Sequence, residues 1–278
     1  MVQPVNWGEL VARALDEDVG AGDVTVAALG LSDTPARGAI IARQDGVLFG
    51  LEPARLVFAR LDRRVFFRSS FEDGQRFTRG SVIARLTGPA GPILTGERTA
   101  LNFLQHLSGI ATLTAAFVAR ADNIGVAILD TRKTLPGLRA AEKAAVVAGG
   151  GENHRAGLYD GLMIKDNHKR LSGGVRAAVA AATKRRRAHH LVFVEVETPA
   201  EAEEAAAAGA DVIMLDNFDA PTAALAARAV GKRAAVEITG GVTLGNVAAF
   251  ARTGATRISI GALTHSAPAV DFSLELER

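Results

Sequence analysis

Residues 192–241 read VFVEVETPAEAEEAAAAGADVIMLDNFDAPTAALAARAVGKRAAVEITGG and alternate between β-branched and alanine-rich segments. Short runs rich in Val, Ile and Leu occur at 192–196, 212–215 and 235–238. Alanine-rich segments of helical character separate them, at 199–208 and 220–230. Strands that alternate with helices in this way are typical of βαβ units in a parallel sheet. The stretch therefore predicts an α/β fold.

The same alternation extends in both directions along the chain. It predicts further strands at 126–129, 162–164 and 257–260 and further helices at 138–147, 174–186 and 244–252. Charged, polar or glycine residues follow all six strands. In (β/α) barrels the site is built at the carboxyl ends of the strands. A doubly wound open sheet also binds its ligand at carboxyl ends. The barrel is favoured because these residues follow every strand rather than one crossover.

The first hundred residues have a different, mixed α+β character. We expect helices at 7–18 and 52–61 and strands at 38–42, 47–49, 65–67 and 81–86. The run Gly88-Pro89-Ala90-Gly91-Pro92 predicts a break in regular structure. A long helix at 96–120 follows it. This part of the chain therefore predicts a separate domain ahead of the barrel.

Composition excludes several classes of protein. The 278 residues include no cysteine, which excludes disulfide scaffolds, thiol catalysis and cysteine-ligated zinc or iron–sulfur clusters. A net charge of +2 and 5% aromatic residues argue against a nucleic-acid-binding protein. No run of about 18 apolar residues occurs, so no membrane span is expected. The acidic N-terminal segment lacks a signal-peptide core, and the cytoplasm is the expected compartment.

Two glycine-containing loops follow the last two predicted strands. They are Thr239-Gly240-Gly241 and Ile260-Gly261, and His265 comes shortly after the second. Loops of this kind hold phosphate groups in barrel enzymes, because glycine lets backbone N–H groups approach the oxygen atoms. Alternatively, each is only a tight turn between a strand and a helix. Two such loops on successive strands favour the phosphate interpretation.

Basic residues gather between 132 and 165. Arg132, Lys133 and Lys165 follow strands, where a cation needs a counter-charge or an anionic ligand. Arginine and lysine together suit a substrate with several anionic groups. Arg139 and Lys143 lie four residues apart on a predicted helix and are equally well explained as surface charges. Gly149-Gly150-Gly151 leads into His154-Arg155, which favours a substrate loop over a flexible connector.

Acidic residues end two neighbouring predicted strands. Glu197 and Asp216 are positioned to bind Mg²⁺, to hold sugar hydroxyls or to act as acid and base. The alternative is that they only neutralise nearby cations. Glu195 shares a strand face with Glu197, and we expect at least one of them to pair with a cation inside the barrel. Glu237 is ambiguous in the same way.

Seven ordered segments together resemble the quinolinate phosphoribosyltransferase family. They are 96–102 (GERTALN), 130–137 (DTRKTLPG), 149–160 (GGGENHRAGLYD), 163–168 (MIKDNH), 194–197 (VEVE), 214–218 (MLDNF) and 261–266 (GALTHS). The resemblance implies an N-terminal α/β sandwich domain, residues 1–108, beside an incomplete (β/α) TIM-like barrel, residues 109–278. The tail at 266–278 is expected to return to the first domain.

The resemblance also implies a reaction. Quinolinate and phosphoribosyl pyrophosphate would give nicotinate mononucleotide, pyrophosphate and CO₂, in de novo NAD biosynthesis and with Mg²⁺ as cofactor. The working unit would be a homodimer with each site shared across the interface, or a higher oligomer.

By the same resemblance, roles pass to the matching positions of this chain. Quinolinate would be bound by Arg132, His154, Arg155, Lys165 and, from the partner subunit, Arg98. Lys133 would lie near the pyrophosphate, and Glu197 and Asp216 near the ribose and Mg²⁺. The 5′-phosphate would be held by Thr239, Gly240, Gly241, Gly261 and His265. The catalytic group would comprise Lys133, Lys165, Glu197 and Asp216.

Two positions depart from the family pattern. Thr239 stands where the family usually has serine, and Ala144 where it commonly has an aromatic residue; neither removes a charged position.

Three alternative functions compete with the transferase. They are a related protein of molybdenum transport, a Schiff-base aldolase using Lys165, and a non-catalytic phosphosugar sensor. The set of strand-end cations and carboxylates favours the transferase, since a sensor needs no such set.

Overall fold

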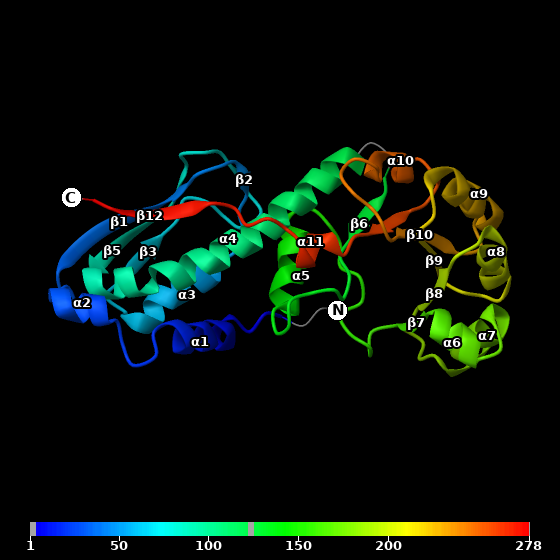
Figure 1. Ribbon diagram of the computed structural model, residues 1–278, viewed down its shortest axis with the longest axis horizontal. Coiled ribbons are helices and arrows are strands. Elements are labelled where there is room, and N and C mark those ends of the chain that lie inside the picture. Colours follow the sequence, from blue (N-terminus) through cyan, green and yellow to red (C-terminus); the bar gives the residue numbers. More distant parts are fainter. Residues whose placement is uncertain (1–3, 122–124, 278) are drawn as a thin grey trace. The chain divides into compact units, whose positions relative to one another are not determined.

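The computed structural model describes residues 4–121 and 125–277. These residues form two compact units (Figure 1). We call one the N-terminal unit, residues 4–113, 147–150 and 267–277, and the other the barrel unit, residues 114–146 and 151–266. The division at 113/114 falls inside a long helix, as does the domain boundary expected at 108/109.

The N-terminal unit is built on an antiparallel sheet with the strand order β12-β1-β5-β3. Its strands are β1 (Pro35–Ala42), β3 (Phe66–Arg68), β5 (Val82–Pro89) and β12 (Phe272–Leu276), and a two-stranded sheet comprises β2 (Gly46–Val47) and β4 (Arg76–Phe77). The helices are α1 (Trp7–Asp18), α2 (Val24–Leu29), α3 (Leu51–Leu61) and α4 (Ala90–Ala121). Gly38 of β1 pairs with both Leu276 and Leu86, so the C-terminal residues complete this sheet.

The core of the N-terminal unit lies between the sheet and helices α3 and α4. Ile40, Ile83 and Leu86 come from the strands, and Phe58 and Leu104 from the helices, and all five are fully buried. By length and composition, α4 passes the test for a membrane-crossing helix. However, 56% of its most apolar window is buried inside the protein, as expected for a core helix.

The start of α4 corrects a sequence-based expectation. The glycine- and proline-rich run at 88–92 was expected to break regular structure, yet the helix begins at Ala90, within that run. Pro92 is tolerated there because the first turn of a helix leaves its backbone N–H groups without intrahelical partners.

The barrel unit contains a parallel sheet with the strand order β6-β11-β10-β9-β8-β7 (Figure 1). The strands are β6 (Ala127–Leu129), β7 (Leu162–Ile164), β8 (Val192–Val196), β9 (Val212–Asp216), β10 (Ala235–Thr239) and β11 (Arg257–Ser259). The helices are α5 (Arg139–Ala148), α6 (Asp166–Leu171), α7 (Val175–Arg185), α8 (Pro199–Ala207), α9 (Ala220–Val230), α10 (Val247–Ala251) and α11 (Ala262–His265). All six predicted strands are confirmed.

The sheet does not close into a complete barrel. β6 pairs with β11, and β7 pairs with β8, so these two consecutive strands form the two edges. A closed barrel of this type needs eight strands. One further bridge, between Leu129 and Glu152, runs parallel to β6 and leads the chain past this edge into the segment that carries His154.

Side chains alternate between the two faces of the sheet. Along β8, Val192, Val194 and Val196 are fully buried, and Phe193 and Glu195 lie on the opposite face. Strand register aligns Glu195 with Met214, Met214 with Glu237 and Glu237 with Arg257. We call this row the interior layer, because the register places its side chains on the same face as Phe193.

Candidate active site

A cavity of about 710 Å³ opens where the carboxyl ends of the parallel strands converge. Residues at or just after the ends of five strands line it, and β8 contributes Glu195 from within the strand, in agreement with the pattern expected of a barrel. The predicted site residues among its lining are Arg132, Lys133, His154, Arg155, Lys165, Asp216, Thr239, Gly240, Gly241, Gly261 and His265. Arg98, an exposed residue of α4, and Glu197 are outside the lining as far as the described residues go.

Arg132 and Arg155 give the cavity its positive character. The guanidinium of Arg155 donates to the Gly161 carbonyl at 3.1 Å and contacts the Met163 sulfur at 3.2 Å. Burial, and then the like charge of Arg132, lowers the pKa of Arg155. The Nε–H groups of both arginines are buried and have no hydrogen-bond partner among the described residues. Since buried donors are almost always satisfied, these two N–H groups indicate an anionic ligand.

Two carboxylates and a lysine occupy another part of the cavity. Lys165 forms an ion pair with Glu195, an interior-layer residue. Of Glu195 and Glu197, Glu195 is therefore the one that pairs with a cation inside the barrel. Asp216 is half-buried at the end of β9. Burial, and then the negative charge of Glu195, raises the pKa of Asp216. A bound cation or a hydroxyl donor would stabilise the ionised form of a carboxylate in this environment.

Glu197 lies one residue beyond β8, and its side chain is exposed. The negative charge of Asp166 raises the pKa of Glu197. Its backbone N–H donates to Glu201 at 3.0 Å. The structure therefore brings Glu195, rather than Glu197, into the cavity with Asp216. Strand alternation alone would place both glutamates on one face. β8 ends at Val196, so Glu197 lies outside the strand and its side chain is exposed.

The first glycine loop depends on an unusual neighbour. Asn217 has a φ of 57°, the left-handed region that non-glycine residues rarely occupy. Its backbone N–H donates to the Thr239 carbonyl at 2.9 Å. A Cβ atom on Gly240, whose φ is +81°, would lie 2.3 Å from the Asn217 side-chain oxygen. Gly240 is thus required both by its backbone conformation and by this close approach.

The second glycine loop makes room for the side chains of Lys133 and His265. A Cβ atom on Gly261 would lie 3.0 Å from Cδ of Lys133 and 3.1 Å from Nε2 of His265. The buried hydroxyl of Thr264 donates to the Lys133 carbonyl at 2.7 Å and fixes the backbone of that residue. The structure therefore gathers Lys133, Gly261 and His265 at one edge of the cavity.

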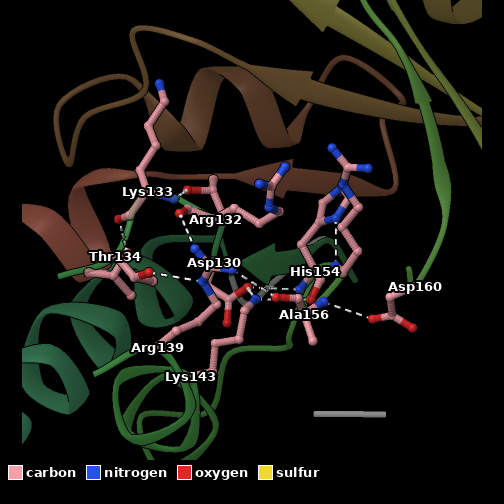
Figure 2. Close-up of polar contacts among 12 residues, drawn as sticks. Asp130, Arg132, Lys133, Thr134, Arg139, Lys143, His154, Ala156 and Asp160 are labelled. Atoms are coloured by element: carbon pink, nitrogen blue, oxygen red, sulfur yellow. Dashed lines mark hydrogen bonds and ion pairs between the residues drawn. The ribbon is translucent and has the colours of Figure 1, made fainter. Parts of the chain in front are cut away.

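A buried ion pair holds the loop that carries His154 and Arg155 (Figure 2). Lys143 and Asp130 are fully buried and pair with each other. Asp130 accepts the His154 backbone N–H at 2.9 Å, and Lys143 donates to the His154 carbonyl at 2.9 Å. Burial, only partly opposed by Lys143, raises the pKa of Asp130 to about 6. We call these two side chains the backbone clamp.

Arg139 has a similar supporting role. Its guanidinium donates to the Thr134 hydroxyl at 3.0 Å and to the Ala156 carbonyl at 3.2 Å (Figure 2). Asp160 accepts the Ala156 N–H at 2.7 Å. Of the two interpretations left open for Arg139 and Lys143, the surface one is therefore wrong. Both side chains connect helix α5 to the loops on either side of the cavity.

Beneath the cavity, the interior layer holds a second charged group that sequence reasoning left ambiguous. Glu237 is fully buried and accepts from Arg257 Nε at 2.9 Å. Its other oxygen lies 3.3 Å from His154 Nε2. Burial would raise the pKa of Glu237, but its contacts with His154 and Arg257 outweigh burial and lower it. No sequence motif marks this group, although the period-two pattern of β10 places Glu237 on the same face as Thr239.

No set of three or more His, Asp or Glu side chains suited to hold a metal ion occurs within residues 4–121 and 125–277. A metal at this site would therefore need ligand atoms from a substrate as well as from the protein. Mg²⁺ commonly binds in this way, through one or two carboxylates and substrate phosphates.

Comparison with known proteins identifies the lineage of both units. Residues 23–108 match the family model described as the quinolinate phosphoribosyl transferase N-terminal domain, and residues 110–275 match that of the C-terminal domain. The chain is 44% identical over 262 residues to a probable nicotinate-nucleotide pyrophosphorylase (carboxylating) of Bacillus subtilis, covering 94% of this chain and 90% of the relative.

Two further comparisons agree. The chain is 39% identical over 277 residues to the nicotinate-nucleotide pyrophosphorylase (carboxylating) of Mycobacterium leprae, covering 96% of each chain. The crystal structure of NadC from Streptococcus pyogenes superposes with a TM-score of 0.94 at 40% identity, covering 100% of this chain and 98% of that one.

Proposed function

The chain belongs to the quinolinate phosphoribosyltransferase family, and we infer that it transfers the phosphoribosyl group of phosphoribosyl pyrophosphate to quinolinate with loss of CO₂. The products are nicotinate mononucleotide, pyrophosphate and CO₂, and the reaction serves NAD biosynthesis. The observation that carries this assignment at the site is the pair of buried, unpartnered guanidinium N–H groups on Arg132 and Arg155.

Quinolinate is a dianion, and its two adjacent carboxylates need paired cations when they leave water. Arg132 and Arg155 supply planar donors that suit carboxylates, and Lys165 supplies a third positive charge. All three line the same cavity. We assign the pyridine dicarboxylate to this group. His154, which lines the same cavity, is assigned to quinolinate as well, and Arg98 of the partner subunit completes the pocket.

The phosphoribosyl group is assigned to the opposite part of the cavity. The loops at Gly240, Gly241 and Gly261, together with His265, would hold the 5′-phosphate. Thr239 retains the hydroxyl that serine supplies elsewhere in the family. Lys133, which lies against Gly261, would meet the pyrophosphate. Asp216 would face the ribose hydroxyls.

The residues present fit a Mg²⁺ ion held jointly with pyrophosphate oxygens. Asp216, with Glu195 nearby and Glu197 beyond β8, supplies the oxygen ligands that Mg²⁺ prefers. When bound, the ion would neutralise charge on the departing pyrophosphate. We therefore keep Mg²⁺ as the proposed cofactor, with Asp216 as its first protein ligand.

The chemistry follows from these placements. The pyridine nitrogen forms a bond to C1 of the ribose as the bond to pyrophosphate breaks, through an oxocarbenium-like sugar, as in glycoside cleavage. Carboxylates beside the ribose stabilise the positive charge on the sugar, and Lys133 stabilises the leaving group. The bond between the ring and the 2-carboxylate then breaks. Its electron pair is drawn toward the positive ring nitrogen, and a proton from solvent takes the place of CO₂.

The proposed working unit is a homodimer with Arg98 shared across the interface, and the proposed compartment is the cytoplasm. The shared site is supported by the exposed position of Arg98 on α4, where it is accessible to a partner subunit.

Initial-rate assays of two variants test the assignment. Arg132→Ala and Lys165→Ala are expected to lose turnover of quinolinate and to keep the circular dichroism spectrum of the wild type. Arg176→Met, which removes an exposed ion pair of the same unit, serves as the matched control. Near-normal activity in either site variant would remove that residue from the proposed pocket.

A further inference from the structure

Glu237 lies below the substrate cavity and, within the described part of the chain, is absent from its lining. It nevertheless contacts His154, which does line it. Glu237 faces two donors, Arg257 Nε–H at 2.9 Å and His154 Nε2 at 3.3 Å. A buried carboxylate paired once with arginine is already neutralised. The contact with His154 therefore calls for a separate explanation.

The second nitrogen of His154 identifies the form of the ring. Nδ1 accepts the backbone N–H of Arg155 at 2.7 Å, so Nδ1 carries no proton. The ring proton then resides on Nε2, which faces Glu237. A histidine ring has only two nitrogen atoms, and Nδ1 is engaged by the Arg155 amide. Nε2 lies 3.3 Å from a Glu237 oxygen but, among the described residues, the pair does not form a well-aligned hydrogen bond.

The rest of His154 is held equally firmly. Asp130 and Lys143 of the backbone clamp bond its N–H and its carbonyl. The ring packs on Phe193 with a centroid separation of 4.8 Å and is almost fully buried. Because the ring is held by Phe193 and accepts the next residue's amide N–H, its position fixes the backbone of that next residue. That residue is Arg155, whose guanidinium faces the cavity.

We propose that Glu237 is a positioning residue: through the Nε2–H form of His154, it sets the backbone and guanidinium of Arg155 for the substrate carboxylate. His154 is then the connection between the interior layer and the cavity. The kinetic part of this inference rests on the proposed function. The state of the His154 ring does not.

The variant Glu237→Gln separates the two possibilities. Its side-chain amide has one oxygen, which can accept from either Arg257 or His154, so an N–H group would face the other donor. If that donor is His154 Nε2–H, the ring can avoid the clash by moving its proton to Nδ1, where the proton would face the Arg155 N–H. Either outcome disturbs Arg155, while Asp216 and the glycine loops keep their own contacts.

The first measurement is the long-range ¹H–¹⁵N NMR spectrum of the wild type, with the His154 signal assigned by its loss in His154→Asn. A neutral ring protonated on Nε2 is expected. A ring protonated on Nδ1, or on both nitrogens, at neutral pH would overturn the inference. This measurement needs no substrate, so it gives an answer even if the protein does not turn over quinolinate.

The second measurement is a kinetic comparison of wild type, Glu237→Gln and the control Thr253→Val, which loses a buried hydrogen bond away from the cavity. Glu237→Gln should raise the KM for quinolinate by roughly tenfold or more, the effect of losing one charge-assisted hydrogen bond. Its KM for phosphoribosyl pyrophosphate should stay within about twofold of the wild type. Thr253→Val should lower the melting temperature and leave both KM values unchanged.

Two results would contradict a positioning role. One is an unchanged quinolinate KM and an unchanged His154 spectrum in Glu237→Gln. The other is an equal rise in both KM values with a lower melting temperature, which is the signature of a merely structural residue. If Glu237→Gln does not fold, Glu237→Asp keeps the charge and shortens the reach to His154, and the same two readouts apply to it.

Discussion

Replacing Lys143 by methionine should destabilise the protein strongly, although the lysine lies outside the cavity lining. Lys143 and Asp130 are fully buried and paired. Without the lysine, Asp130 must remain charged without its partner or take up a proton. Removing one partner of a buried pair typically costs about 3–5 kcal/mol.

The cost can also be worked out as the free energy needed to protonate Asp130. An aspartate with an ordinary pKa of 3.8 needs about 1.4 kcal/mol per pH unit to be protonated above that value. At pH 7 this amounts to roughly 4 kcal/mol, and at pH 5 to roughly 2 kcal/mol. Burial raises the pKa of Asp130, so the stability gained by protonation is present at low pH and lost as pH rises. The deficit of Lys143→Met should therefore grow from pH 5 to pH 8.

Urea-induced unfolding followed by circular dichroism measures this difference between matched variants. Arg176→Met is the control, because its pair with Glu204 is 4.0 Å long and exposed, and such pairs contribute about 0–1 kcal/mol. Adding Asp130→Asn to Lys143→Met should restore part of the stability, because it removes the unpaired charge. A loss below about 1 kcal/mol at pH 7, or a loss independent of pH, would show that Lys143 does not stabilise a buried charge on Asp130.

Three further predictions concern the site itself. Gly240→Ala should weaken phosphoribosyl pyrophosphate binding more than quinolinate binding, because its Cβ would lie 2.3 Å from the Asn217 side chain; equal effects on both KM values would contradict this. Relative to Asp130→Asn, the wild type should gain stability as pH falls from 8 to 4 through the Asp130 pKa of about 6, and unfolding at both pH values checks the sign. Mixing Arg98→Ala chains with Lys165→Ala chains should restore partial activity through hybrid dimers; no recovery after verified subunit exchange would count against a shared site.

Much of the fold follows from residues visible in the sequence. β-Branched runs such as Val192–Val196 predicted the parallel strands, because burial on both faces selects such residues. The pairing of β6 with β11 was not predicted, since local sequence does not specify which distant strands meet. Helix α2, helix α6 and strand β12 were also missed, because each is too short for a clear periodicity.

The candidate site divides along a similar line. Residues directly after strands, such as Arg132 and Asp216, were found because topology alone brings strand ends together. Glu197 was chosen because it directly follows the predicted strand and matches a family position, and local sequence does not show that Glu195, within the strand, lines the cavity while Glu197 is exposed. Lys143 and Glu237 were left ambiguous because a charge in the sequence carries no mark of burial, and only their distant partners, Asp130 and Arg257, reveal it.

The central claim is that this cavity couples phosphoribosyl transfer to the loss of one carboxylate. The direct test supplies purified protein and Mg²⁺ with phosphoribosyl pyrophosphate and quinolinate labelled in its 2-carboxylate. We expect labelled CO₂ and nicotinate mononucleotide in equal amounts, and no product when nicotinate or nicotinamide replaces quinolinate. Product from nicotinate, or phosphoribosyl pyrophosphate binding without turnover of quinolinate, would contradict it.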